Sequence, residues 1–134
     1  MTAYSTGRCL CGGVTYQVNG PLREVWACHC TQCRQTSGNF VAATNARRAD
    51  LVFLSDATLT WFPSSGTAER GFCQRCGGNL FWRRTAPDNQ TISIMAGTLD
   101  PPTGLKLAAH IFTAGKSDYY DIADGAPQHA AWGT

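Results

Sequence analysis

Cysteine spacing is the feature that most constrains the fold of this chain. The 134-residue sequence contains seven cysteines, which lie in three tight clusters: Cys9-x-Cys11, Cys28-x-Cys30-x2-Cys33 and Cys73-x2-Cys76. An odd number of cysteines cannot pair completely in disulfides. The polar first eight residues do not resemble a secretory signal peptide, so we expect a cytoplasmic, reducing compartment. Metal thiolates therefore explain the clusters better than a disulfide framework does.

The first and third clusters resemble each other and predict one closed metal site. A tetrahedral zinc ion with Zn–S bonds of about 2.3 Å needs sulfurs roughly 3.8 Å apart. Residues i and i+2 of an extended segment share a face, so Cys9 and Cys11 can converge on one ion. Glycine follows both clusters, at Gly12 and Gly77, and lets the chain turn back around the ion. The sequence thus predicts a structural zinc with four ligands: Cys9, Cys11, Cys73 and Cys76.

The middle cluster has three sulfurs and no obvious fourth partner. Cys28, Cys30 and Cys33 could bind a second zinc that keeps an open coordination position, as catalytic zinc sites do. His29 and His110 are candidate fourth ligands that would close this site. In an extended segment, however, His29 would point away from the metal, because its two neighbours face it. A redox dithiol and a loosely bound zinc are the alternatives that the residues leave open.

Composition and charge predict a globular domain and exclude some partners. Hydrophobic residues make up 43% of the chain and charged residues 15%, and no apolar run approaches the roughly 20 residues that cross a bilayer. We therefore expect one domain over residues 1–134, with no membrane partner. The net charge of +2 is too small to indicate a nucleic-acid partner, which would require a clustered basic face.

Short alternating and β-branched segments predict an all-β domain with at most short helical turns. One helical turn is expected over residues 31–36, where Ser37 and Gly38 would stop it. The expected strands cover residues 14–18, 24–28, 40–44, 51–54, 59–62, 68–72, 80–83, 91–96 and 110–113.

Large apolar residues of these strands are the predicted core. Trp82, Tyr119, Tyr120 and Trp132 could instead line a ligand cleft, although aromatic residues more often fill cores. The core candidates are Val14, Tyr16, Val18, Trp26, Val52, Leu54, Trp61, Phe81, Ile92, Ile94 and Ile111.

Several segments together carry a resemblance to a known family. They are GRCLCGGV at 7–14, CHCTQCRQTSG at 28–38, GFCQRCG at 71–77 and GTLD at 97–100. The pattern resembles the glutathione-dependent formaldehyde-activating enzyme family, which includes relatives of centromere protein V. The resemblance implies a small, mainly β zinc-binding fold. It also implies a structural zinc at the first and third clusters and a catalytic zinc at the middle cluster.

The activity implied by this resemblance joins formaldehyde to glutathione and gives S-(hydroxymethyl)glutathione, which makes the enzyme a carbon–sulfur lyase in the reverse direction. We therefore expect a zinc-dependent lyase that acts on adducts of an aldehyde with a small thiol such as glutathione. A thiolate added to three cysteines needs a nearby cation, and Arg34 is the first candidate. Arg34, Arg75 and Lys116 are expected to contact substrate carboxylates. The alternative is a non-enzymatic zinc module that binds a protein partner. The sequence specifies no oligomeric state.

Overall fold

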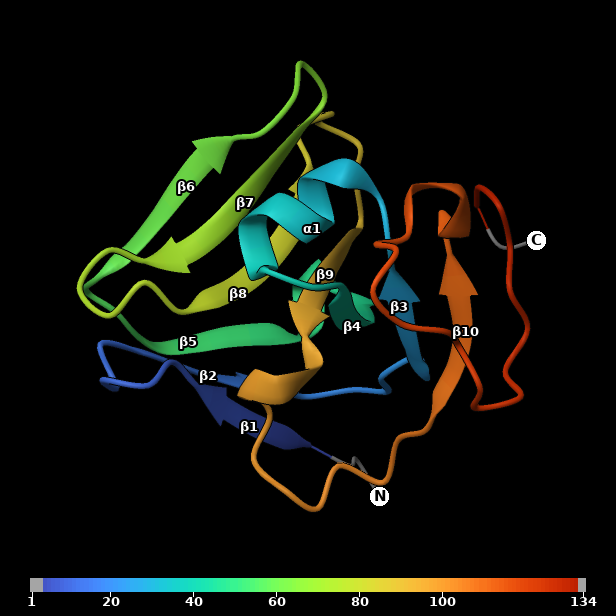
Figure 1. Cartoon of the computed structure of the whole chain (residues 1–134). Coiled ribbons are helices and arrows are strands. Elements are labelled where there is room, and N and C mark those ends of the chain that lie inside the picture. The colour runs from blue at the N-terminus through green and yellow to red at the C-terminus, as the bar shows by residue number, and fades with distance from the viewer. Residues whose placement is uncertain (1–3, 133–134) are drawn as a thin grey trace.

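The computed structural model describes residues 4–132, which form two β-sheets and one short α-helix (Figure 1). A three-stranded sheet has the order β1-β2-β5, and a seven-stranded sheet has the order β10-β3-β4-β9-β8-β7-β6. The strands are β1 Ser5–Arg8, β2 Val14–Val18, β3 Val25–Cys28, β4 Val41–Arg47, β5 Leu51–Asp56, β6 Leu59–Pro63, β7 Ala68–Cys73, β8 Asn79–Arg84, β9 Thr91–Met95 and β10 Leu107–Ile111. The helix is α1 Thr31–Ser37, and single 3-10 turns are η1 Arg48–Asp50, η2 Ala96–Thr98 and η3 Thr113–Gly115. The all-β prediction is confirmed.

Nine of the strands match the predicted segments to within a few residues, and β1 is the one that was not predicted. Its sequence, STGR, lacks the alternation of apolar residues that marks a strand. Gly7 explains why the segment nevertheless fits here. A Cβ atom at this position would lie 2.3 Å from the Tyr16 hydroxyl, so only glycine lets β1 approach β2 this closely.

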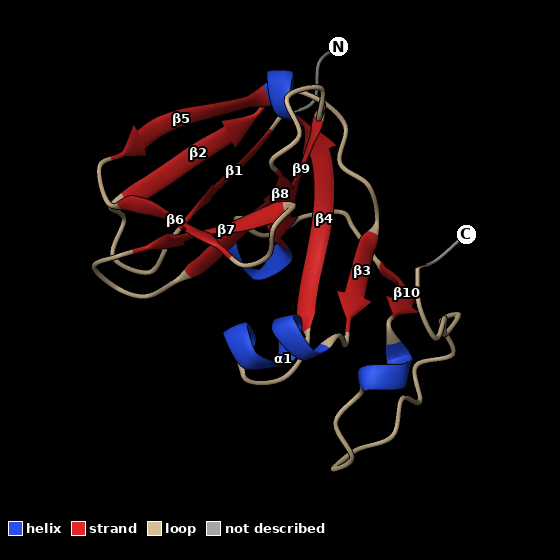
Figure 2. Ribbon diagram, turned by 90° about the horizontal axis from the view of Figure 1, so that it is seen from above, coloured by secondary structure: helices blue, strands red, loops and turns tan. Residues whose placement is uncertain are grey.

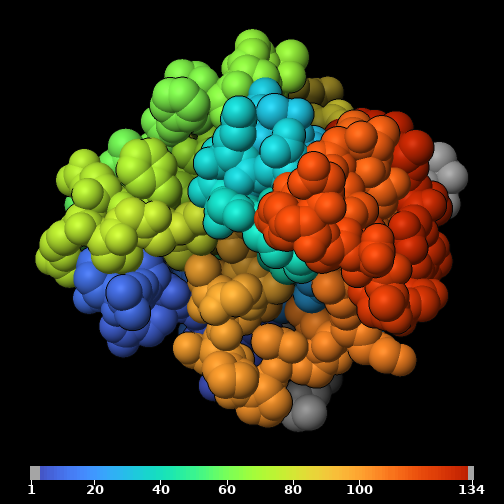
Figure 3. Space-filling model, in the orientation of Figure 1, coloured from blue at the N-terminus to red at the C-terminus, as the bar shows by residue number. Residues whose placement is uncertain are grey.

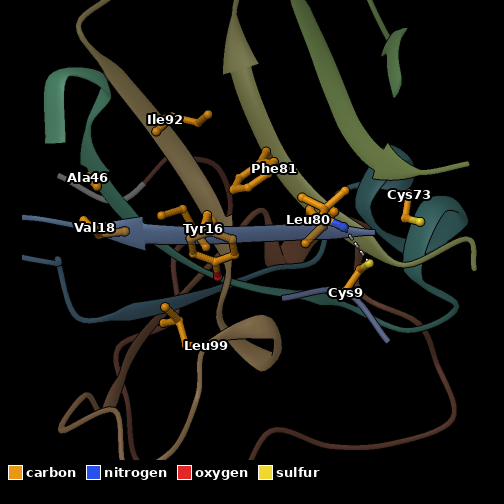
Figure 4. Close-up of a cluster of buried hydrophobic side chains, with 11 residues drawn as sticks. Cys9, Tyr16, Val18, Ala46, Cys73, Leu80, Phe81, Ile92 and Leu99 are labelled. Atoms are coloured by element: carbon orange, nitrogen blue, oxygen red, sulfur yellow. Dashed lines mark hydrogen bonds between the residues drawn. The ribbon is translucent and has the colours of Figure 1, made fainter. Parts of the chain in front are cut away.

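The main core lies between the two sheets, and alternation along β2 turns every second residue of that strand into it. Val14, Tyr16 and Val18 of β2 are fully buried, and they meet Phe81 and Ile94 of the large sheet. The Tyr16 and Phe81 rings pack edge to face with centroids 5.3 Å apart. Figure 4 shows Cys9 and Cys73 at one end of this core, so the first cysteine site is continuous with it.

The predicted orientation of β5 is wrong. Val52 and Leu54 were expected in the core, but they are 42% and 63% exposed. Pairing with β2 instead places Leu51 opposite Val18 and Phe53 opposite Tyr16, and both inward residues pack on the core. Because side chains alternate along a strand, a shift of one residue exchanges the buried and exposed sets. The apolar run from 51 to 54 carries no alternation that could fix this choice.

The other face of the large sheet forms the floor of the candidate site. Cross-strand pairing aligns Arg70, Trp82 and Ser93 in one row over β7, β8 and β9. A second row aligns Met95, Ala43 and Trp26 over β9, β4 and β3. Trp26, predicted as core, is therefore half-buried on this face, while its neighbours Val25 and Ala27 are buried on the other.

The helix α1 connects β3 to β4 and lies at the ends of these strands (Figure 2). Cys30 caps its N-terminus, with the thiol sulfur accepting a hydrogen bond from the Cys33 amide at 3.3 Å. Gly38 ends the helix in the left-handed conformation, with φ of 85°, as the Ser37-Gly38 sequence predicts. The cap thus fixes two cysteines of the middle cluster relative to each other.

The chain after β10 folds back along the outer edge of the large sheet. His110 forms a β-bridge with Gln128, and the Phe112 amide donates to the Ala131 carbonyl oxygen at 2.9 Å. Figure 3 shows this segment beside α1 on the surface. Within residues 4–132, the chain forms no helix with the length and apolar character that crossing a membrane requires.

Candidate metal centres and the adjoining cavity

Cys9, Cys11, Cys73 and Cys76 converge although more than sixty residues separate the two pairs. Their four sulfurs all lie within 4.8 Å of one another. The Sγ–Sγ distance is 3.7 Å from Cys9 to Cys11 and 3.5 Å from Cys11 to Cys73. These distances are close to the roughly 3.8 Å edge of a tetrahedral zinc–thiolate site. The donor set therefore fits a closed, four-sulfur zinc site.

The turns after these cysteines aim hydrogen-bond donors at the sulfurs. Gly12 and Gly77 adopt φ values of 78° and 76°, as expected from their place after each cysteine pair. The Val14 amide donates to Cys9 Sγ at 3.3 Å, and the Cys76 amide donates to Cys73 Sγ at 3.4 Å. Such donors stabilise thiolates, the form in which cysteine binds a metal.

Two side chains add to the stabilisation of the same sulfurs. A hydrogen bond from Thr58, 3.1 Å from Cys73 Sγ, is the main cause that lowers the pKa of Cys73 to about 5. Arg75 Nε donates to Cys11 Sγ at 3.3 Å and lies at this closed site. The structure thus places Arg75 at the first cysteine site rather than at the middle cluster.

Cys28, Cys30 and Cys33 form the second group, in which the three sulfurs also lie within 4.8 Å of one another. Cys28 ends β3, whereas Cys30 and Cys33 belong to the first turn of α1 and its cap. Hydrogen bonds from the Cys28 and Cys33 thiols lower the pKa of Cys30, and the same coupling raises the pKa of Cys28. Three converging sulfurs fit a zinc ion that leaves one coordination position for an outside ligand.

Arg70 is the cation that contacts this trio, and sequence reasoning did not single it out. The side chain is 5% exposed, and Nη2 donates to Cys33 Sγ at 3.7 Å. Arg70 Nε is buried and has no hydrogen-bond partner among residues 4–132. A buried guanidinium with an unused donor is costly unless an anion or a polar ligand atom meets it. Arg70 also lines the cavity that adjoins the trio, so its guanidinium can meet a group that enters the site.

A cavity of about 400 Å³ adjoins the three cysteines. Its floor is the open face of the large sheet, and α1 and the segment after β10 complete its walls. Trp82 and Trp132, which the sequence offered as alternative cleft residues, both line it. The other lining residues are Arg23, Trp26, Cys28, Cys30, Thr31, Gln32, Cys33, Val41, Ala43, Arg70, Ser93, Met95, Ile111 and Phe112.

The two other cations proposed for substrate contacts lie elsewhere. Arg34 is half-buried on α1 and is not among the residues that line the cavity. Lys116 Nζ donates to the carbonyl oxygens of Ser117 and Tyr120 and lies 4.5 Å from the centre of the Tyr120 ring. The cation that the fold brings to the middle cluster is thus Arg70, and no local sequence pattern predicted its contact with Cys33.

His29 belongs to a buried hydrogen-bonded chain behind the cysteine trio. Its Nδ1 lies 2.9 Å from the Tyr120 hydroxyl, and its Nε2 lies 2.9 Å from His110 Nδ1. His110 Nε2 in turn lies 2.7 Å from Asp124 Oδ2. When both imidazoles are neutral, one direction satisfies every group: Tyr120 donates to His29, His29 to His110, and His110 to the carboxylate. Burial lowers the pKa of His29, which favours the neutral form of that ring.

These hydrogen bonds decide whether His29 or His110 can bind a metal ion. Both ring nitrogens of each histidine are occupied by hydrogen bonds, so neither is available as a fourth ligand. His29 points away from the trio, as expected for a residue between two ligands of an extended segment. These hydrogen bonds instead hold the Cys28–Cys30 segment against β10 and the residues that follow it.

A comparison with protein families agrees with the cysteine geometry. A model described as glutathione-dependent formaldehyde-activating enzyme matches residues 4–115. The chain belongs to this family. The matched range contains all seven cysteines and Arg70. It ends before Tyr120, Asp124 and Trp132.

Two individual proteins similar to this family member were also found. One is an uncharacterized lyase of Schizosaccharomyces pombe, 27% identical over 119 residues, which cover 88% of this chain and 85% of the relative. The other is a crystal structure of a Rhodobacter sphaeroides protein, with a TM-score of 0.60 and 23% identity, which covers 92% of this chain and 98% of that one. The second likeness shows the shared fold.

The hydrogen bond between Tyr120 and His29 gives a stability prediction for this member of the formaldehyde-activating family. Tyr120→Phe removes the donor to His29 Nδ1 and leaves a buried acceptor unpaired, which is expected to cost about 1–3 kcal/mol in the free energy of unfolding. Tyr119→Phe is the matched control. Its hydroxyl donates to Asn39 at an exposed position, so the expected change is below about 0.5 kcal/mol. Urea denaturation of both variants measures the difference, and equal costs would contradict the role given to Tyr120.

Proposed function

We propose that this protein is a zinc-dependent carbon–sulfur lyase that forms and cleaves adducts of a thiol with an aldehyde. Three observations on the cavity support this function together. Three cysteine sulfurs converge at its wall, an open coordination position fits their geometry, and a buried arginine contacts one of them. The family name and the lyase name of the yeast relative agree with this reaction class.

The reaction requires a thiolate, because a neutral thiol is a weak nucleophile toward a carbonyl carbon. Zinc bound by Cys28, Cys30 and Cys33 would supply a positive charge that lowers the pKa of an incoming thiol. In the forward direction, the substrate S–H loses its proton to water. A C–S bond then forms while the C=O π electrons move to oxygen, which takes up a proton. The reverse sequence cleaves the adduct.

Arg70 is positioned to stabilise the oxygen atom of the aldehyde during the reaction. As the C–S bond forms, negative charge develops on the former carbonyl oxygen, and a preorganised donor there lowers the barrier. Arg70 lines the cavity beside the trio, and its Nη2 donates to Cys33 Sγ. The guanidinium also offsets the negative charge of three thiolates. We assign to Arg70 both the oxygen contact and this charge compensation.

The decisive experiment is an NMR exchange measurement between formaldehyde and glutathione. The adduct also forms spontaneously, so the wild-type protein must accelerate the exchange above that background. Cys30→Ser is expected to return the rate to the background, whereas Gln35→Ala, an exposed position on the same helix, keeps the wild-type rate. A wild-type rate equal to the background would refute the enzymatic function. One inert zinc per chain would then favour a non-enzymatic zinc module.

A further inference from the structure

The cavity beside the trio is much larger than a one-carbon aldehyde requires. Its volume of about 400 Å³ falls in the range of roughly 300–1,000 Å³ that is typical of sites for larger organic ligands. The three cysteines line it together with residues of the open sheet face. A group attached to the reacting carbon would therefore extend from the sulfurs over the open face of the sheet.

The walls of this space are apolar and aromatic. Trp26 and Trp82 lie on the sheet floor, in the two rows of cross-strand partners described above, with Met95 between them on β9. Trp132 comes from the segment after β10 and packs edge to face on Phe112, with ring centroids 4.9 Å apart. Trp132 is 53% exposed although it is a large aromatic residue. Such surfaces gain free energy by contact with an apolar ring.

Charge in the cavity also limits what it can hold. Two arginines line it, and within residues 4–132 no acidic side chain does. Glutathione carries one ammonium group, which would find no carboxylate partner here, and two carboxylates, for which only Arg23 and Arg70 are at hand among the lining residues. Arg23 is already engaged, since its guanidinium lies 4.0 Å above the Trp26 ring and donates to the Ala43 carbonyl oxygen at 3.1 Å. The peptide part of a glutathione adduct therefore suits the exterior better than the cavity.

We propose that the cavity binds the aldehyde-derived group of the thiol adduct, and that this group is apolar and preferably aromatic. The proposal rests on the proposed function for the position of the sulfur at the trio. It goes further by naming the substrate class: adducts of aldehydes with an aromatic or bulky apolar substituent. The substituent would contact Trp82 and Met95, and the oxygen on the reacting carbon would face Arg70.

Binding of two stable thioethers to the zinc-loaded protein tests this substrate class. S-benzylglutathione and S-methylglutathione share the peptide and differ only in the group on sulfur. Burial of the ring is expected to make the benzyl compound bind about tenfold to a hundredfold more tightly, as measured by calorimetry. Equal dissociation constants, or no binding of either compound, would overturn the proposal.

Two tryptophan variants locate the bound ring. Trp82→Leu is expected to reduce the preference for the benzyl compound at least severalfold. Trp61→Leu is the matched control, because Trp61 of β6 stacks on Phe81 and Arg83 and does not line the cavity. Its preference should equal that of the wild type. An unchanged preference in Trp82→Leu would place the ring elsewhere and contradict the proposal.

These binding results are independent of the exchange assay. A strong benzyl preference without acceleration of formaldehyde–glutathione exchange would support the cavity ligand and refute only the lyase activity on formaldehyde. Exchange with benzaldehyde in place of formaldehyde then decides whether the larger aldehyde is the substrate. Acceleration with formaldehyde but no benzyl preference would support the lyase and refute the substrate class. The two hypotheses can therefore fail separately.

Discussion

Replacing Cys73 by serine is expected to unfold the protein. A structural zinc contributes roughly 10–16 kcal/mol to folding in zinc-finger peptides, which is comparable to the roughly 5–15 kcal/mol by which whole domains are stable. Cys73 is fully buried and belongs to the main core, next to Leu80. Its loss therefore removes a metal ligand and disturbs the contact between the sheets. Far-UV circular dichroism and zinc analysis of the purified variant measure both effects.

Cys30→Ser provides the matched control for this prediction. Cys30 is half-buried and packs on the smaller cluster around Cys33 and Met95, away from the core between the sheets. This variant should keep the wild-type circular dichroism spectrum and lose one zinc ion per chain. A chelator added to the wild-type protein should reproduce the unfolding of Cys73→Ser. If Cys73→Ser kept its spectrum and two zinc ions, the four-sulfur site would have no structural role.

Much of the cysteine geometry could be predicted because its determinants are local. C-x-C on an extended segment and C-x2-C before a glycine each bring two sulfurs together without help from the rest of the fold. Gly12 and Gly77 adopt the positive φ values that this reasoning requires. The resemblance of the two pairs then indicated that they meet. The same kind of local signal predicted α1 and its end at Gly38.

Contacts that depend on sheet register could not be predicted in this way. Arg70 lies 37 residues from Cys33 in sequence, and only the order of β7, β8, β9 and β4 in the sheet brings the two together. A strand with the sequence AERGFC gives no reason to bury its arginine. The exchange of buried and exposed residues on β5 has the same origin, since pairing with β2 decides which face of the strand is buried. The cavity likewise needs the whole sheet and the segment after β10.

Alternation along β8 and β9 contained more information on the site than sequence reasoning extracted. Phe81 and Ile94 face the core, so their neighbours Trp82 and Ser93 must face the opposite side of the sheet. Trp82 is therefore a large aromatic side chain on the face where α1 and the trio lie. Once the core face of a central strand is known, a large apolar residue on its opposite face indicates a cavity wall.

Arg70→Gln is expected to lower kcat for adduct exchange by about 10²–10³-fold, the usual effect of removing one preorganised donor from a developing oxyanion. Glutamine keeps an uncharged polar group at the position but lacks the guanidinium that contacts Cys33 and lines the cavity. Because the oxygen carries its negative charge mainly in the transition state, kcat should fall much more than KM rises. Steady-state kinetics by NMR measures both constants.

Three comparisons separate this role of Arg70 from a structural one. Arg47→Gln changes an arginine whose side chain is 70% exposed, far from the trio in the fold, and should leave kcat unchanged. Zinc content and circular dichroism of Arg70→Gln should match the wild type, since the three sulfur ligands remain. Arg70→Lys keeps the charge but not the forked donor geometry, so partial recovery of kcat is expected. A loss of zinc in Arg70→Gln, or an equal fall in the Arg47 variant, would show that Arg70 maintains the site instead of contacting the reacting oxygen.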